Sequence, residues 1–299
     1  MTNAVANIDK NDFAAMAALM GVATPAKGKK SNLARLRLNH KAIMGTAEIK
    51  GKTKKVEVVP AGTYRIDLDD GSQLYAESAT FRPFMSRFMH KRFVKGMGDK
   101  PNKFIKTLMG TNINVDLKDT EGTSNCGRPS GFIKDWAAVP KATQDLIKAT
   151  KRTRVMLGTV TFTDAVTAAG KDATVVDVPV IYEVDNRDAF KMYDNQYKAL
   201  EKKGLLPVYY PFALTAEEKP LPNGDSFYLP VCAVDITADM VEVSAEDMET
   251  LTGFNDWVEN YNAYVTDAWS SKHQEPVDEA DAEIIDMFIA EDDDVEVED

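Results

Sequence analysis

Phenylalanine and cationic residues are concentrated between positions 81 and 95. This segment contains Phe81, Phe84, Phe88 and Phe93 together with five Lys or Arg residues. Aromatic rings can stack on unpaired bases while cations contact phosphates, so the combination is typical of proteins that bind single-stranded nucleic acid. The alternative is that Phe84 and Phe88 lie in the core and the cations are merely solvated. We favour the nucleic-acid interpretation because the segment lies in a wider basic region.

The candidate nucleic-acid contacts come from this segment and from four other places in the basic half of the chain. They are Arg82, Phe84, Arg87, Phe88, Lys91, Arg92 and Phe93, with Lys52, Lys54, Lys55, Tyr64, Tyr75, Arg128, Lys151 and Arg152. Lysines at a hairpin tip often serve only solubility. Cations at the end of a helix, such as Lys151 and Arg152, also complement the helix dipole. Those two groups therefore have a structural explanation as well as a functional one.

Charge is distributed unevenly along the 299 residues. The net charge is −11, but residues 1–154 contain 28 Lys and Arg against 14 Asp and Glu, whereas residues 155–299 contain 8 against 33. The last 25 residues, 275–299, hold 13 carboxylates and neither Lys nor Arg. A basic half joined to an acidic tail indicates a nucleic-acid partner.

The acidic tail also contains an apolar patch that includes Ile285, Met287 and Phe288. A segment so rich in carboxylates cannot build a core alone, so we expect it to be disordered. It could be only a solubilising end. The functional interpretation is that it mimics the charge of DNA, occupies the basic groove when DNA is absent and then offers the three apolar residues to replication or recombination proteins.

Signatures of enzymes and metal sites are missing or weak. The chain contains no GxSxG, GxGxxG or HExxH motif, and Ala23 stands where the phosphate loop ending at Ser31 would require glycine. Asp67, Asp69 and Asp70 could bind a divalent metal, but Asp is also favoured in a hairpin turn for conformational reasons. Cys126 and Cys232 belong to no zinc motif. We therefore expect a protein that is not an enzyme and has no metal or other cofactor.

The hydrophobic periodicity predicts many short strands and a few helices. The expected strands include 33–38, 47–50, 55–59, 64–68, 73–76, 103–109, 112–117, 154–162, 174–184, 207–214 and 227–234. Periodicity does not distinguish a strand from a helix at 80–95, where we favour a strand. Helices are expected at 11–20, 142–150, 186–203 and 244–269, the last with Ser244 and Asp247 as an N-terminal capping pair.

This succession indicates a β-rich α+β fold, and our best single interpretation is an elaborated OB-like barrel with peripheral helices. We expect an N-terminal arm at 1–31, a nucleic-acid-binding core with insertions at 32–272 and an acidic C-terminal tail at 273–299. One or two OB-like domains would fit the length of the core.

The longest apolar runs are too short to span a bilayer, which requires roughly 20 residues. A secretory signal begins with a basic region followed by a long apolar one, but the N-terminal segment of this chain contains Asp9, Lys10 and Asp12 instead. We therefore expect a cytoplasmic protein with no membrane partner.

The arrangement of a short arm, an OB-like core and an acidic tail resembles the single-stranded DNA-binding proteins of tailed bacteriophages. Lys29-Lys30-Ser31 is similar to a basic triplet followed by Ser or Thr in the arm of some members, and Lys151-Arg152-Thr153 is similar in the core. Some members hold zinc, for which this sequence lacks the ligands. The resemblance implies a coat on single-stranded DNA in replication, recombination or repair, in the host cytoplasm if phage-encoded, with possible self-association on DNA.

Two other hypotheses stay open at this point. One is a structural or scaffold protein of a virion that uses its charge asymmetry for assembly. The other is a nuclease or another nucleic-acid enzyme. The sequence does not distinguish DNA from RNA as the ligand.

Overall fold

The protein is described from a computed structural model that covers residues 33–49, 52–96, 98, 101–131, 133–221 and 226–273. Contacts divide the chain into two units, Met1–Leu33 and Ala34–Asp299. Everything below concerns the second unit. The predicted helix at 11–20 and the acidic tail lie outside the described residues. None of the described helices is long and apolar enough to cross a membrane.

Twelve strands, three α-helices and two short 3-10 helices make up the described chain. The strands are β1 (Ala34–Leu38), β2 (Ile43–Ile49), β3 (Lys52–Val59), β4 (Tyr64–Asp67), β5 (Gln73–Ala76), β6 (Ala79–Val94), β7 (Lys103–Lys106), β8 (Thr150–Phe162), β9 (Val166–Thr167), β10 (Val178–Val184), β11 (Phe212–Pro220) and β12 (Ser226–Val234). The helices are η1 (Asn125–Gly127), α2 (Lys141–Ala149), α3 (Arg187–Glu201), η2 (Pro207–Tyr209) and α4 (Ala245–Ser271).

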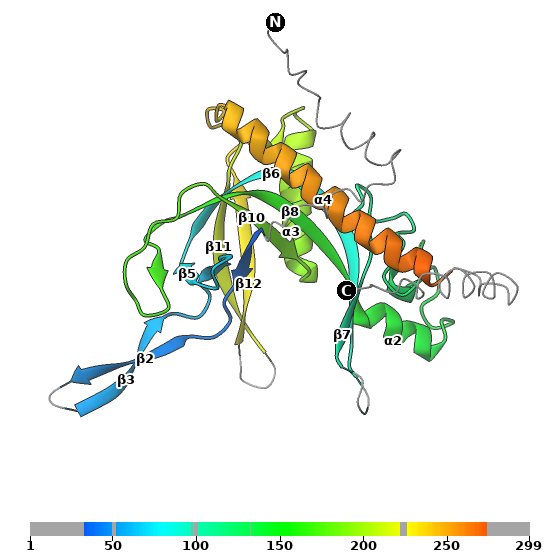
Figure 1. Cartoon of the computed structure of the whole chain (residues 1–299), viewed down its shortest axis with the longest axis horizontal. Coiled ribbons are helices and arrows are strands. Elements are labelled where there is room, and N and C mark those ends of the chain that lie inside the picture. Colours follow the sequence, from blue (N-terminus) through cyan, green and yellow to red (C-terminus); the bar gives the residue numbers. More distant parts are fainter. Residues whose placement is uncertain are drawn as a thin grey trace, which may run out of the picture. The chain divides into compact units, whose positions relative to one another are not determined.

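Ten strands form one mixed sheet in the order β12-β11-β6-β8-β10-β1-β4-β5-β9, with β7 paired to the far part of β6 (Figure 1). Only the pairing of β1 with β10 is parallel among the described strands. The hairpin of β2 and β3 is a separate sheet. The β-rich α+β prediction is thus confirmed, and the large sheet is open rather than closed on itself.

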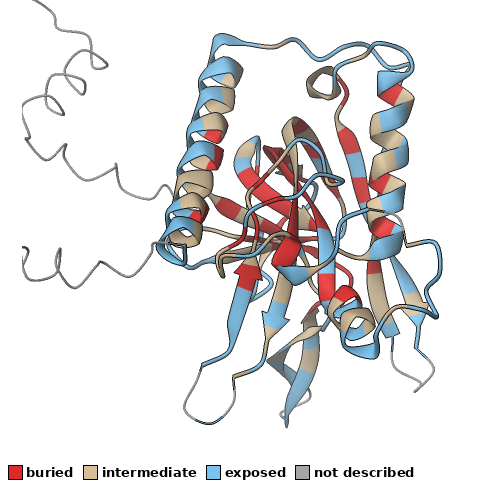
Figure 2. Cartoon of the chain, turned by 90° about the vertical axis from the view of Figure 1, so that its right-hand side faces the viewer, coloured by how far each residue is buried: buried red, intermediate tan, exposed pale blue. Residues whose placement is uncertain are grey.

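The main core lies between one face of this sheet and α3. Alternate residues of β10, namely Val180, Tyr182 and Val184, belong to it, as do Tyr193 and Leu200 of α3. Buried positions accordingly concentrate on the central strands (Figure 2). Each such large side chain contributes roughly 1.5–3 kcal/mol by leaving water. Cys126 and Cys232 are both free thiols and both buried.

Both predicted long helices are present, and each begins with a capping residue. The Asn186 side chain accepts hydrogen bonds from the backbone N–H groups of Asp188 and Ala189 at the start of α3. Ser244 and Asp247 form the expected capping box of α4. Further along α4, Asn262 binds the Met109 backbone in both directions, at 2.8 and 3.1 Å. These bonds fix α4 against the loop that follows β7.

The predicted strand at 112–117 is wrong, because this region is a loop organised by buried side chains. Asp119 is fully buried and accepts hydrogen bonds from the backbone of residues 121, 123 and 126 and from the Thr123 hydroxyl. The Asn125 side chain accepts a hydrogen bond from the Leu117 backbone N–H at 3.0 Å and donates one to Asp116 at 2.7 Å. The end of this segment is therefore bound by side chains rather than by a neighbouring strand. The strand predicted from 207 likewise begins only at Phe212, after η2.

Gly158 of β8 lies opposite the β-bulge of β6, and we predict that Gly158→Ala is strongly destabilising. A Cβ atom at this position would lie 2.2 Å from the Arg82 carbonyl oxygen and 2.9 Å from the Phe81 ring. Such overpacking should lower the free energy of unfolding by about 3 kcal/mol. Gly253→Ala is the control, since an added Cβ meets nothing there and alanine favours a helix by about 1 kcal/mol. Urea denaturation of both variants measures the difference, and equal stability would contradict the prediction.

Candidate nucleic-acid interface

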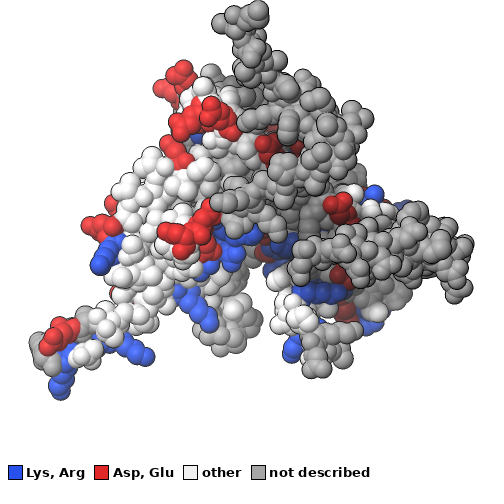
Figure 3. Space-filling model, in the orientation of Figure 1, with Lys and Arg blue, Asp and Glu red and all other residues white. Residues whose placement is uncertain are grey.

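A groove of about 620 Å³ opens where β1, β6 and β10 end and where β8 and β12 begin. Its charged lining consists of Arg35, Arg37, Lys91, Lys106 and Lys151 against Glu183 and Asp185. Five cations and two carboxylates give this lining a net positive charge of three. Figure 3 shows Lys and Arg side chains gathered on the side from which the hairpins project.

Ion pairs hold the centre of the groove in place. Lys91 Nζ lies 2.9 Å from a Glu183 oxygen and 2.7 Å from an Asp185 oxygen. Burial opposes the charge of Lys91, but the two carboxylates outweigh burial and raise its pKa. Burial likewise opposes the charges of Glu183 and Asp185, yet the surrounding cations, Lys91 foremost, lower their pKa values. All three groups are therefore charged at neutral pH.

Two cations of the groove are left available for an anion. Lys106 makes no ion pair within the described chain, and its pKa is lowered mainly by burial and further by Arg35, Lys91 and Arg37, against the opposing effect of Glu183. Lys151 reaches Asp185 only at 3.5 Å, with its side chain 58% exposed. Lys106 and Lys151 thus belong to a groove lining whose cations outnumber its carboxylates. Phosphate groups would be attracted to such a place.

One side of the groove is formed by β12, which the curvature of the sheet brings beside the end of β1. The Tyr228 backbone N–H donates to His40 Nδ1 at 3.4 Å. The Tyr228 ring packs against Gly62, where a Cβ would lie 2.4 Å from a ring carbon. Burial lowers the pKa of His40, which favours the neutral imidazole that can accept this bond.

Aromatic rings and lysines alternate on the face of β6 and β7 that borders the groove. Lys91 pairs with Lys106 across the two strands, and Phe93 pairs with Phe104 two residues further on. Because side chains two residues apart share a face of a strand, these four residues lie on the same face. The Phe93 and Phe104 ring centroids are 5.1 Å apart, and the residues are 49% and 57% exposed. This pair is therefore available for stacking.

Several predicted contacts are instead part of the protein interior. Tyr64 is fully buried and its hydroxyl donates to the Thr215 carbonyl at 2.9 Å, while Tyr75 is only 2% exposed. Phe84 packs edge-on against Phe254 of α4. Phe88 lies against Phe190 of α3 and beneath the buried Arg154 guanidinium. We therefore exclude Tyr64, Tyr75, Phe84 and Phe88 from the candidate interface, because helices or strands already cover their rings.

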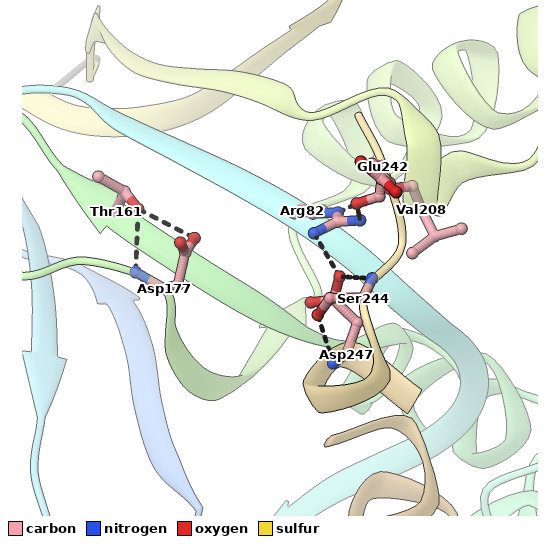
Figure 4. A network of polar contacts seen from close by, with 7 residues as sticks. All are labelled: Arg82, Thr161, Asp177, Val208, Glu242, Ser244 and Asp247. Atoms are coloured by element: carbon pink, nitrogen blue, oxygen red, sulfur yellow. Dashed lines mark hydrogen bonds and ion pairs between the residues drawn. The ribbon is translucent and has the colours of Figure 1, made fainter. Parts of the chain in front are cut away.

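Arg82 joins β6 to the start of α4 rather than pointing into the groove. Its guanidinium donates to the Val208 and Glu242 carbonyl oxygens, each at 2.8 Å, and to Asp247 at 3.0 Å (Figure 4). Its nitrogens are committed to these partners, so the predicted phosphate contact is corrected to a structural role. The same view shows Asp177 bound to Thr161 at the far end of β8.

The remaining predicted contacts are dispersed. Lys52, Lys54 and Lys55 are exposed on β3, away from the groove lining. Arg87 donates to the Ser86 carbonyl and does not line the groove. Arg128 and Arg152 line a second hollow together with His90, and Arg92 lies two residues after His90 on the same face of β6. Ile285, Met287 and Phe288 lie outside the described residues.

The groove also contains residues that the sequence reasoning missed, namely Arg35, Arg37, Lys106 and Phe104. A usable signal existed for two of them. A ring and a lysine lie two residues apart in Phe104-Ile105-Lys106, as they do in Lys91-Arg92-Phe93. The two segments stand on either side of the connection between the strands that became β6 and β7. Arg35 and Arg37 alternate with Leu36 and Leu38, but nothing local indicates that β1 lies beside β10.

Two of the three aspartates considered for a metal, Asp67 and Asp70, have other partners. Asp67 pairs with Arg37 at 3.2 Å and Arg65 at 2.8 Å, and Asp70 accepts the Ser72 backbone N–H in the turn. Within the described ranges, no three His, Cys, Asp or Glu residues are grouped so as to hold a metal ion.

Comparisons with models of protein families, with curated proteins and with solved structures gave no match for this chain.

Proposed function

We propose that this protein binds single-stranded DNA without catalysing a reaction on it. The observation that carries the proposal is the face of β6 and β7 on which the Lys91–Lys106 pair lies beside the Phe93–Phe104 pair, at the border of a net positive groove. Stacking of a base on an aromatic ring contributes about 1–3 kcal/mol. Each phosphate that a lysine neutralises releases counterions and strengthens binding at low salt.

The wider proposal concerns the biological role. The order of arm, β-rich core and acidic tail supports a coat protein of the kind that tailed bacteriophages use in replication, recombination or repair. In that proposal the tail recruits replication or recombination proteins, the protein acts in the cytoplasm, and copies associate along DNA. The OB-like interpretation of the core remains a prediction, since the large sheet is open.

The proposal is tested with fluorescently labelled oligonucleotides in a salt titration. We expect a single strand to bind much more tightly than a duplex of the same sequence, because rings stack only on bases that are not already stacked. The fraction bound is followed by anisotropy. Equal affinity for the two forms would contradict stacking. No binding to either form at low salt would favour the virion assembly alternative.

Two sets of variants locate the interface. Phe104→Ala should weaken binding about 5- to 150-fold, which corresponds to the loss of one stacked base, while Tyr264→Ala, an exposed aromatic residue on α4, should leave it unchanged. Replacing Lys106 and Lys151 with Gln should reduce the log–log salt slope by about 0.7 per lost contact. Lys202→Gln is the matched control at the end of α3. Unchanged affinity and slope in the groove variants would place the interface elsewhere.

A further inference from the structure

A second, smaller hollow lies on the opposite face of β6 and β8. It measures about 330 Å³ and is lined by His90, Ile113, Asn114, Asn125, Arg128, Pro129, Ser130, Gly131 and Arg152. His90 pairs with Arg152 across the two strands, directly beside the Lys91–Lys151 pair of the groove. Successive side chains of a strand point to opposite faces. The hollow and the groove are therefore separate sites on the two faces of one ladder.

The cations of this hollow are not neutralised by the protein. Neither Arg128 nor Arg152 makes an ion pair with a carboxylate among the described residues. Burial lowers the pKa of Arg128, and the nearby charge of Arg152 lowers it further. The adjacent carboxylates serve other partners: Asp116 accepts from the Asn125 amide, and Asp119 accepts four hydrogen bonds within its loop. Two guanidinium groups thus share one hollow without a counter-ion from the described chain.

His90 supplies one buried ring nitrogen, Nδ1, that has no hydrogen-bond partner among the described atoms. The residue is 2% exposed. Burial, Arg128 and Arg152 together lower the pKa of His90 to about 4, against the smaller opposing effect of a hydrogen bond with the Ile113 backbone. The ring is therefore neutral at physiological pH. A buried nitrogen without a hydrogen bond and two neighbouring arginines without a carboxylate both cost free energy while the hollow is empty. A ligand that accepts hydrogen bonds and carries negative charge would remove both costs.

We infer that this hollow is a phosphate site in which Arg128 and Arg152 hold the anion and His90 donates a hydrogen bond to it. Guanidinium groups match the oxygens of a phosphate and bind them more strongly than neutral donors do. A bound dianion would also remove the repulsion between the two arginines and stabilise a proton on His90. The phosphate could belong to a polynucleotide, in which case the inference rests on the proposed function, or it could be free.

The binding test uses the full-length protein and inorganic phosphate, with histidine rings labelled for NMR. The chain has only three histidines, so His273 serves as an internal reference at the end of α4, and His90→Gln assigns the His90 signal. We expect phosphate to shift the His90 resonance saturably and to leave His273 in place. Arg128→Gln with Arg152→Gln should abolish the shift, while Arg187→Gln, an exposed arginine of α3, should not. No saturable shift of the wild-type His90 signal at millimolar phosphate would overturn the inference.

The pH dependence provides a second readout. Sulfate is the probe here because its charge is constant in this range. A bound anion raises the pKa of His90 above its free value, so sulfate affinity should increase as the pH falls from 8 toward about 5. His90→Gln should remove that increase while retaining binding through the arginines. A wild-type affinity that is independent of pH would contradict the role of His90.

Oligonucleotide binding by the double arginine variant distinguishes the source of the phosphate. A salt slope reduced by about 0.7 for each lost contact would assign the site to the backbone of a polynucleotide. An unchanged slope together with a lost phosphate shift would assign it to a free phosphate. If the wild-type protein binds phosphate but no oligonucleotide, the site stands and the proposed function fails. If the wild-type protein binds oligonucleotides but not phosphate, the proposed function stands and the phosphate site is refuted.

Discussion

Replacing Arg82 with methionine is expected to lower the free energy of unfolding by about 3 kcal/mol without weakening DNA binding. The Arg82 and Asp247 side chains are only 13% and 17% exposed. Methionine would fill the volume but leave the Val208 and Glu242 carbonyl oxygens without their charged donor, and it would leave Asp247 without its counter-ion. The loss should therefore exceed that of an ordinary surface ion pair. Chemical denaturation measures it.

Arg87→Met is the matched control, because it changes the same residue type on the same strand. Among the described residues, the Arg87 guanidinium bonds only the neighbouring Ser86 carbonyl, at 3.1 Å, so we expect little loss of stability. Both variants should bind an oligonucleotide as the wild type does, since neither residue lines the groove. An Arg82 variant as stable as the Arg87 variant would refute the structural role. A folded Arg82 variant with weakened binding would restore Arg82 to the interface.

The Arg82–Asp247 contact also predicts an effect of acid. Burial opposes the charge of Asp247, but the Ser244 backbone N–H and Arg82 outweigh burial and lower its pKa below the ordinary value of 3.8. A carboxylate with a depressed pKa in the folded state stabilises the protein above its unfolded pKa, and this contribution is lost as the pH falls through the folded value. The Arg82→Met variant should consequently lose less stability than the wild type between pH 5 and pH 2.

Local patterns predict those elements whose determinants are close together in the sequence. The β2–β3 and β4–β5 hairpins and the capped starts of α3 and α4 are all of this kind. The parallel pairing of β1 with β10 joins Ala34 to Val180, and no local pattern specifies which distant strand becomes the neighbour. The prediction of a strand at 112–117 fails because the order of this loop comes from the buried Asp119 and Asn125 rather than from its own hydrophobic residues.

In the candidate site too, local sequence predicts some features, while contacts with distant parts of the chain decide the others. Residue types in β6 predict an aromatic and basic strand, but they do not indicate where along its sixteen residues a helix covers it. Phe84 is covered by α4 and Phe88 by α3, whereas Phe93 lies beyond both and remains half exposed. The alternation along the strand also sends Lys91 and His90 to opposite faces, so one basic run in the sequence becomes two separate sites in the fold.

Deleting residues 275–299 is expected to tighten DNA binding about tenfold at low salt. The removed segment carries 13 carboxylates and no cation, and in the proposed function it competes with DNA for the groove. A tether holds such a segment near its target at an effective concentration on the order of 1 mM, so a tail that binds with a dissociation constant of about 0.1 mM would weaken DNA binding about tenfold. Both attractions are screened by salt, and the difference should shrink as ionic strength rises.

The control keeps every charge of the tail but replaces Ile285, Met287 and Phe288 with Ser. Because competition with DNA depends on the carboxylates, this variant should bind oligonucleotides as the full-length protein does, while it should lose any partner that recognises the apolar patch. Affinities of the three proteins for one oligonucleotide are compared by anisotropy across a salt series. If the truncated protein binds no more tightly than the full-length protein at any salt, the tail does not compete with DNA. If the serine variant binds as tightly as the truncated one, competition comes from the apolar residues rather than from charge.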